Sequence, residues 1–140
     1  MKTISQYLTY NGQCKEAMTF YKSCFGGELN LMTFGQSPLA AQIPDDKIDW
    51  VMHSNLTIDG DIFLRASDNE GSNPFILGNN ISLFVECNSD EELDDLFEKL
   101  SESGKVIMPV EQQFWGSRLG MLLDKFGVNW MLIYEKENVT

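Results

Sequence analysis

Residues 14–27 read CKEAMTFYKSCFGG, and this stretch decides the first half of the fold. Its apolar residues recur at the spacing that lines one face of an α-helix. They are Cys14, Ala17, Met18, Tyr21, Cys24 and Phe25. Gly26 and Gly27 follow, and glycine readily adopts the left-handed conformation that ends helices. The pattern predicts an amphipathic helix over residues 14–25 that covers an apolar surface.

The segments around this helix have the composition of β-strands, with many β-branched and aromatic residues. The predicted strands are residues 4–10, 28–34, 51–58 and 61–66. Asp59-Gly60 separates the last two and is a strong signal for a two-residue hairpin turn. Residues 35–49 lack periodicity and predict a long loop, a kind of segment that is often functional.

The second half of the chain repeats this order. Ser89-Asp90-Glu91-Glu92 fits a capping box and opens a second amphipathic helix that Gly104 closes. The predicted strands are residues 81–87, 105–110, 114–123 and 128–135. The polar, glycine-containing residues 69–79 read as a linker. We therefore expect one domain, residues 1–140, made of pseudo-repeats 1–68 and 80–140.

Each half reads strand, helix, strand, strand, strand, which predicts an α+β fold. A four-stranded sheet covered by one helix buries only one of its faces, so the other face needs a partner. The second half is the obvious partner for the first. We expect the two βαβββ modules to form a curved mixed sheet, or cup, with the helices outside. Cups of this kind are natural sites for small molecules.

Composition narrows the function classes. The formal net charge is −11, from 21 acidic and 10 basic residues, and such a surface repels nucleic acid and anionic membranes. No apolar run approaches the ~20 residues of a membrane span, and the N-terminus lacks the pattern of a signal peptide. The three cysteines form no CxxC motif and read as reduced thiols. We expect a cytoplasmic protein.

Several motifs spread over the chain carry a family resemblance. They are Tyr7–Gly12, Phe25–Glu28, Met52–Leu56, Phe114–Gly120 and Asp124–Trp130. Together they resemble the PhnB-like branch of the glyoxalase/bleomycin-resistance (vicinal oxygen chelate) superfamily. The Phe-Trp-Gly and Asp-x-Phe-Gly-Val-x-Trp pieces are the most specific. The resemblance covers nearly the whole chain and implies the same two-module fold.

The resemblance also implies partners and a metal. Relatives often form homodimers, and some exchange halves between chains. The enzymes among them are lyases, isomerases and dioxygenases that hold a divalent ion with His and Glu side chains, whereas other relatives bind antibiotics. The matching positions here are Gln6 or Leu8, Arg65 to Ser67, Asn80 or Ser82, and Met131 or Ile133. None is His or Glu, and amides and thioethers suit a hard cation poorly, so we expect no metal and no cofactor.

His53 is the one histidine of the chain and alternates with Asn55 and Thr57 in a predicted strand. The two-residue period of a strand places these three side chains on one face. We predict that His53 and Asn55 contact a ligand and that His53 is the candidate catalytic base, since imidazole titrates near neutral pH. The alternative is a histidine that serves the strand alone.

In the next strand Ile62, Leu64 and Ala66 alternate with Phe63, Arg65 and Ser67, and we consider the case in which the first set packs on the helix. Phe63, Arg65 and Ser67 then face the cup, where Arg65 is either an anion clamp or the partner of a nearby acid such as Glu86. Glu86 belongs to the predicted ligand-binding set in either case.

An aromatic group in the second half has two interpretations. Phe114, Trp115, Phe126 and Trp130 are either core residues or a wall on which a planar ligand stacks. In the second interpretation Trp115 contacts the ligand and Arg118 supplies a polar anchor.

Three functional hypotheses follow. The first is a protein of unknown specificity that binds a small molecule in the cup without a metal. The alternative is a metal-independent or atypically liganded lyase, isomerase or dioxygenase-type enzyme that uses His53. The third is a protein whose main property is self-association, which the linker at residues 69–79 would suit.

Overall fold

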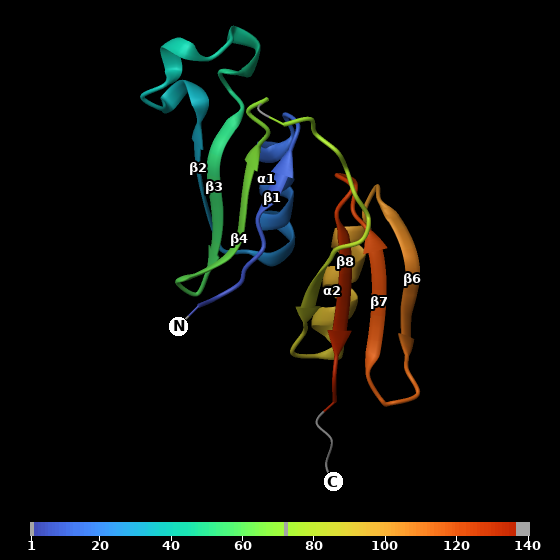
Figure 1. Cartoon of the computed structure of the whole chain (residues 1–140). Coiled ribbons are helices and arrows are strands. Elements are labelled where there is room, and N and C mark those ends of the chain that lie inside the picture. The colour runs from blue at the N-terminus through green and yellow to red at the C-terminus, as the bar shows by residue number, and fades with distance from the viewer. Residues whose placement is uncertain (1, 72, 137–140) are drawn as a thin grey trace. The chain divides into compact units, whose positions relative to one another are not determined.

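The computed structural model describes residues 2–71 and 73–136 of the chain. It consists of two compact units, Met1–Ile76 and Leu77–Thr140. The division between them falls within the predicted linker. Each unit combines one helix with one four-stranded mixed sheet, as Figure 1 shows.

The first unit holds β1 (Leu8–Tyr10), α1 (Cys14–Phe25), β2 (Glu28–Thr33), β3 (Val51–Ile58) and β4 (Asp61–Asp68). The strand order in its sheet is β1-β4-β3-β2, so β3 and β4 are the central strands. β1 runs parallel to β4, and the other neighbours are antiparallel. The predicted helix is confirmed, whereas β1 is shorter than predicted and β4 runs two residues longer, to Asp68.

The core of the first unit lies between α1 and one face of the sheet. The predicted apolar stripe of α1 is buried there, at Cys14, Ala17, Met18, Tyr21 and Cys24. Leu56, Leu64 and Ala66 of the central strands are fully or almost fully buried with it. A buried pair of hydroxyl groups, on Tyr10 and Tyr21, joins β1 to the helix at 2.7 Å. One face of the sheet is thus apolar and covered by the helix.

A β-bulge interrupts the pairing of the two central strands. The register shifts after Leu56, so that Thr57 lies opposite Ile62. Ile62 is 45% exposed, and the ring of Phe63 lies 4.8 Å from the ring of Phe25 at the end of α1. The case in which Ile62 packs on the helix together with Leu64 and Ala66 therefore does not hold. The cause is the extra residue of the bulge, which alters the alternation of side chains along the strand.

The predicted long loop contains three short 3-10 helices, Phe34–Gln36, Ala40–Gln42 and Asp45–Lys47. Its two ends are joined by backbone hydrogen bonds, from Phe34 N to Trp50 O at 2.9 Å and from Gly35 N to Ile48 O at 2.8 Å. The Lys47 ammonium lies 5.1 Å from the centre of the Trp50 ring. The loop therefore closes on itself where it leaves and re-enters the sheet.

The second unit repeats this plan. It holds β5 (Ser82–Glu86), α2 (Asp90–Ser101), β6 (Lys105–Gln112), β7 (Arg118–Leu123) and β8 (Asn129–Tyr134), in the strand order β5-β8-β7-β6. The edge strand β5 is parallel to β8, as β1 is to β4. The predicted α+β fold of two βαβββ modules is confirmed. In the described part of the chain, neither helix has the length and apolarity needed to cross a membrane.

The capping box at the start of α2 is present in a shifted form. The Ser89 hydroxyl accepts the N–H of Glu92 at 3.0 Å, as predicted. The Glu92 carboxylate accepts the N–H of Asn88 at 2.9 Å, one residue earlier than the usual partner. The Ser89 side chain thus satisfies an N–H group that the first turn of the helix leaves without a partner. The Glu92 side chain ties the residue before the N-cap to the helix.

The Asp-x-Phe-Gly-Val-x-Trp motif forms the turn between β7 and β8. One carboxylate oxygen of Asp124 accepts the N–H groups of Phe126 and Val128, at 2.8 and 3.0 Å. The other accepts the indole N–H of Trp130 at 2.8 Å. Trp130 is 1% exposed and Phe126 is also buried. The core interpretation is therefore correct for these two aromatic residues, and the motif stabilises a turn.

Candidate functional site

The face of the first sheet that points away from α1 carries a row of polar side chains. Asn30 of β2 pairs with Asn55 of β3, and Asn55 pairs with Arg65 of β4. Paired residues on neighbouring strands point to the same face, with their side chains adjacent. Because Ser54 and Leu56, on either side of Asn55, are fully buried, Asn55 must point away from the helix.

His53 belongs to a second row on the same face. It pairs with Met32 of β2, and the register continued by one residue places it opposite Ser67 of β4. His53 is exposed and Ser67 is half-buried. The prediction that His53 and Asn55 share a face is confirmed. We call the surface formed by Asn30, His53, Asn55, Arg65 and Ser67 the polar face.

Arg65 lies at the centre of this surface, on one of the two inner strands. Its side chain is half-buried, and its Nη1 donates to the Ser5 hydroxyl at 2.8 Å. Among residues 2–71, no carboxylate lies within ion-pair distance of its guanidinium. The Nδ2 of Asn30 donates to the Oδ1 of Asn55 at 3.5 Å. The polar face therefore places a cationic fork beside two amides.

Asp68 holds the two central strands in place, and sequence reasoning missed it. Its Oδ1 accepts the N–H groups of Gly12 and Cys14, at 2.8 and 3.0 Å, beside the start of α1. Its Oδ2 accepts the N–H of Val51 at 2.8 Å, where β3 begins. The side chain is buried, at 4% exposure. An aspartate at the end of an apolar alternating strand was the only sequence signal, and it resembles an ordinary turn residue.

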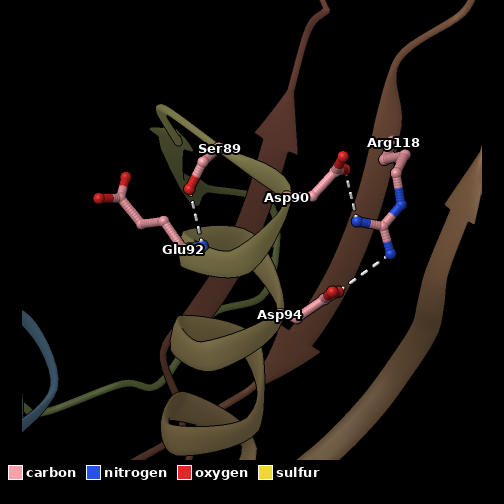
Figure 2. A network of polar contacts seen from close by, with 5 residues as sticks. All are labelled: Ser89, Asp90, Glu92, Asp94 and Arg118. Carbon is pink, nitrogen blue, oxygen red and sulfur yellow. Dashed lines mark hydrogen bonds and ion pairs between the residues drawn. The ribbon is translucent and has the colours of Figure 1, made fainter.

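Arg118 has a different environment from Arg65. Figure 2 shows its side chain reaching from β7 to the first turns of α2, where Nη1 lies 2.8 Å from Asp90 and Nη2 lies 3.0 Å from Asp94. The hydrogen bonds to Asp90 and then Asp94 raise the pKa of Arg118. Its charge is thus already matched by two carboxylates, which favours a structural role over the predicted one as a ligand anchor.

Trp115 lies in the turn between β6 and β7. The predicted strand over residues 114–123 is wrong in its first part, because β7 begins at Arg118. Gln113 N donates to Ser117 O at 2.7 Å and closes the turn. The rings of Phe114 and Trp115 meet edge to face at 4.9 Å, and the Phe114 side chain is 98% exposed. The turn thus presents an exposed aromatic pair.

Glu86 is exposed at the end of β5, opposite Ile133 of β8. It points to the face away from α2, because its neighbour Val85 pairs with the fully buried Leu132. The pairing of Arg65 with Glu86 and the ligand contacts of Glu86 and Trp115 stay predictions.

The donor set does not fit the divalent metal of the superfamily's enzymes. At the matching positions of the first unit, the Gln6 amide donates to the Phe63 carbonyl and Arg65 is a cation. Asn80 or Ser82 and Met131 or Ile133 occupy the positions of the second unit. Across residues 2–71 and 73–136, no group of three or more His, Cys, Asp or Glu side chains is arranged to hold a metal ion. No chemical step is assigned to a metal.

The cysteines are free and buried. Burial raises the pKa of Cys14 to about 12 and that of Cys87 to about 11. Cys14 also lies 3.6 Å from the Ser54 hydroxyl, which donates to the Ala66 carbonyl at 2.7 Å. Since the thiolate is the reactive form of cysteine, these two thiols are core groups and not nucleophiles at neutral pH.

Comparison with known proteins shows the family to which the chain belongs. A family model described as 3-demethylubiquinone-9 3-methyltransferase matches residues 2–133. The chain belongs to this family. It is similar to the PhnB protein from Bacillus cereus, with 28% identity and a TM-score of 0.74 over 95% of this chain and 99% of that one. The resemblance to PhnB-like proteins is thereby confirmed.

Three further proteins extend the comparison. Protein YjdN of Escherichia coli (strain K12) is 30% identical, with 98% of each chain covered. The crystal structure of PA1353 from Pseudomonas aeruginosa is 37% identical, with a TM-score of 0.85 over 98% of this chain and 100% of that one. A glyoxalase-related enzyme from Fulvimarina pelagi, 15% identical, shares the fold alone, with a TM-score of 0.65 over 96% of this chain and 89% of that one.

Proposed function

We propose that this PhnB-like protein binds a small polar molecule on the polar face of its first sheet, without a metal ion. Arg65, Asn55 and His53 are the proposed contacts. The observation that carries the proposal is the register of β2, β3 and β4, which aligns these side chains on the two central strands. Side chains on paired strands hold their positions better than side chains on loops, which suits a binding site.

The polar face also differs from an ordinary solvated surface because its cation, Arg65, has no carboxylate partner among residues 2–71. The chain has 21 acidic residues and 10 basic ones, yet no ion pair neutralises Arg65 within residues 2–71. A half-buried guanidinium with five donors and a single hydroxyl partner retains donors for a ligand. This supports the anion-clamp interpretation of Arg65.

Methyl transfer, which the description of the family names, is not part of the proposal. Adenosyl and dinucleotide cofactors are commonly held by a glycine-rich turn that leads from a strand into a helix. Gly26 and Gly27 instead follow α1, and Gly26 N donates to Lys22 O at 2.8 Å in the manner of a helix end. These glycines serve the fold.

A ligand screen by thermal unfolding tests the proposal. A ligand that binds the native state alone raises the melting temperature by mass action. Arg65→Gln should clearly reduce the shift that a hit produces in the wild-type protein. Arg118→Gln is the matched control, because Arg118 is the only other arginine of the chain and is engaged by Asp90 and Asp94. Hits that stabilise Arg65→Gln as much as wild type would contradict the proposed site.

The second candidate function is a metal-independent or atypically liganded enzyme that uses His53 as a base. The observation that favours it is the exposed imidazole one row from Arg65, so that one group can accept a proton while the other holds an anion. His53→Gln should abolish turnover of any substrate found while leaving its binding nearly unchanged. Unaltered turnover in this variant would remove His53 from the chemistry.

The family resemblance also motivates a proposal about assembly and location. We propose a cytoplasmic homodimer, with halves paired within or between chains. Light scattering at micromolar concentrations should give twice the 15.9 kDa mass of the chain. A monomeric mass under these conditions would contradict the dimer.

A further inference from the structure

We propose that the ligand of the polar face is a small monocarboxylate with an apolar body. This inference rests on the proposed function and adds the chemical class of the ligand. Three features of the first unit carry it: the donors of the polar face, the charge around them and the apolar side chains at its border.

Asn55 and Arg65 supply the hydrogen-bond donors of the polar face. The Oδ1 of Asn55 accepts from Asn30 at 3.5 Å, and Arg65 is the residue paired with Asn55 on the other side, on β4. The Nδ2 of Asn55 donates to no atom of the described residues, and Arg65 gives one bond, to Ser5. These two paired residues therefore both keep N–H groups that have no acceptor among the described residues. A carboxylate has two coplanar oxygens and matches a guanidinium fork with two parallel hydrogen bonds.

The charges on and around the polar face favour a ligand with one negative charge over a ligand with two. One guanidinium balances one carboxylate, whereas a dianion leaves a charge without a partner on a chain of net charge −11. Glu28 lies on the same side of the sheet, because it pairs with Thr57 two residues along β3 from Asn55. Its exposed carboxylate adds local repulsion against a second negative charge.

Apolar side chains border the donors on both sides along the strands. Met32 pairs with His53 in one neighbouring row and is 41% exposed. Ile62 pairs with Thr57 in the other, where the bulge turns it outward, and is 45% exposed. Contact with these side chains would remove apolar surface of the ligand from water. The ligand is therefore an aliphatic or aromatic carboxylate and not a sugar or a nucleotide.

Three probes that share a phenyl ring test this assignment: benzoate, its neutral amide benzamide, and phenyl phosphate, which carries nearly two charges at neutral pH. Binding to the full chain is measured by calorimetry and by amide shifts in NMR spectra. We expect benzoate to bind roughly tenfold more tightly than benzamide, the effect of one charge-assisted pair. Phenyl phosphate should bind more weakly than benzoate.

Variants of the two arginines test whether benzoate binds at the polar face. Arg65→Gln should weaken benzoate binding by about tenfold, Arg65→Lys by less, and Arg118→Gln by under about twofold. Circular dichroism of each variant shows that it is folded. Equal affinity for benzoate and benzamide, with NMR shifts at Asn55, would overturn the carboxylate class and leave the proposed function intact. Binding of all probes and screening hits elsewhere in the chain would overturn both.

Discussion

Asp68 is the side chain through which the local fold of the first unit can be tested most directly. Its buried carboxylate accepts three backbone N–H groups, from Gly12, Cys14 and Val51, at 2.8, 3.0 and 2.8 Å. Asp68→Asn preserves the shape of the side chain. It also replaces one of the two accepting oxygens by an NH₂ group, which is a donor.

The size of the effect follows from these three bonds. With the amide oxygen turned toward Gly12 and Cys14, the new NH₂ group meets the N–H of Val51. A buried donor without an acceptor costs about 1–3 kcal/mol. Loss of the charge from the two remaining bonds and from the start of α1 adds about 1 kcal/mol. We expect the free energy of unfolding to fall by about 2–4 kcal/mol, a large part of the ~5–15 kcal/mol of a typical domain.

Urea unfolding measures this change. With a slope of about 2 kcal/mol per molar urea, the middle of the usual range, the midpoint should fall by about 1–2 M. Asp124→Asn is the matched control, because Asp124 also accepts three N–H groups, all within the second unit. Hydrogen exchange should report the loss at β3 and α1 for Asp68→Asn, and at the β7–β8 turn for Asp124→Asn. A change below about 0.5 kcal/mol for Asp68→Asn would refute the assigned role of its hydrogen bonds.

Three further outcomes are expected. Gly120→Ala should destabilise the protein by about 1–3 kcal/mol in urea, since an added Cβ would lie 2.6 Å from the Phe97 ring; a neutral result would mean that Phe97 moves aside freely. Arg118→Gln should cost at most about 1 kcal/mol, because its ion pairs are partly exposed and salt screens them; a larger loss, measured at high salt, would contradict this. Burial raises the pKa of the Cys14 thiol to about 12 and that of the Cys87 thiol to about 11. Their contribution to stability is complete below 9.0, the pKa of the unfolded state, and is lost as the pH rises from there through the pKa values of the folded state. Thermal unfolding should show stability falling above about pH 9 and less so in Cys14→Ala, and alkylation at neutral pH should be slow.

The sequence predicted the elements of both units well where side-chain periodicity was the only signal required. α1 begins and ends at the predicted residues because its apolar stripe and its terminal glycines are local features. The boundaries of strands were less certain. Arg118 was placed inside a strand that began at Phe114, whereas residues 114–117 form a turn with a Gly116 φ of 101°. A glycine inside a strand-like run was the available signal for that turn.

The candidate site also combines features that the sequence predicted with features that it did not. The period of two residues was enough to place His53 and Asn55 together, because alternation is a property of a single strand. It failed at Ile62, where a bulge adds a residue that only the pairing of β3 with β4 reveals. The two arginines were indistinguishable in the sequence. Contacts with residues distant in the chain separate them, since Arg118 meets two carboxylates and Arg65 meets none among residues 2–71.

By itself, the sequence determined the order of strands and helices, the helix faces that are buried and the family to which the chain is similar, because these are written in local spacing and short motifs. Tertiary structure decided the rest. It selected the register that aligns Asn30, Asn55 and Arg65 across three strands, and it buried Asp68 at the end of β4, beside the starts of β3 and α1. Hydrogen bonds between segments distant in the chain fix register and burial, and no local pattern records which distant partner a side chain will meet.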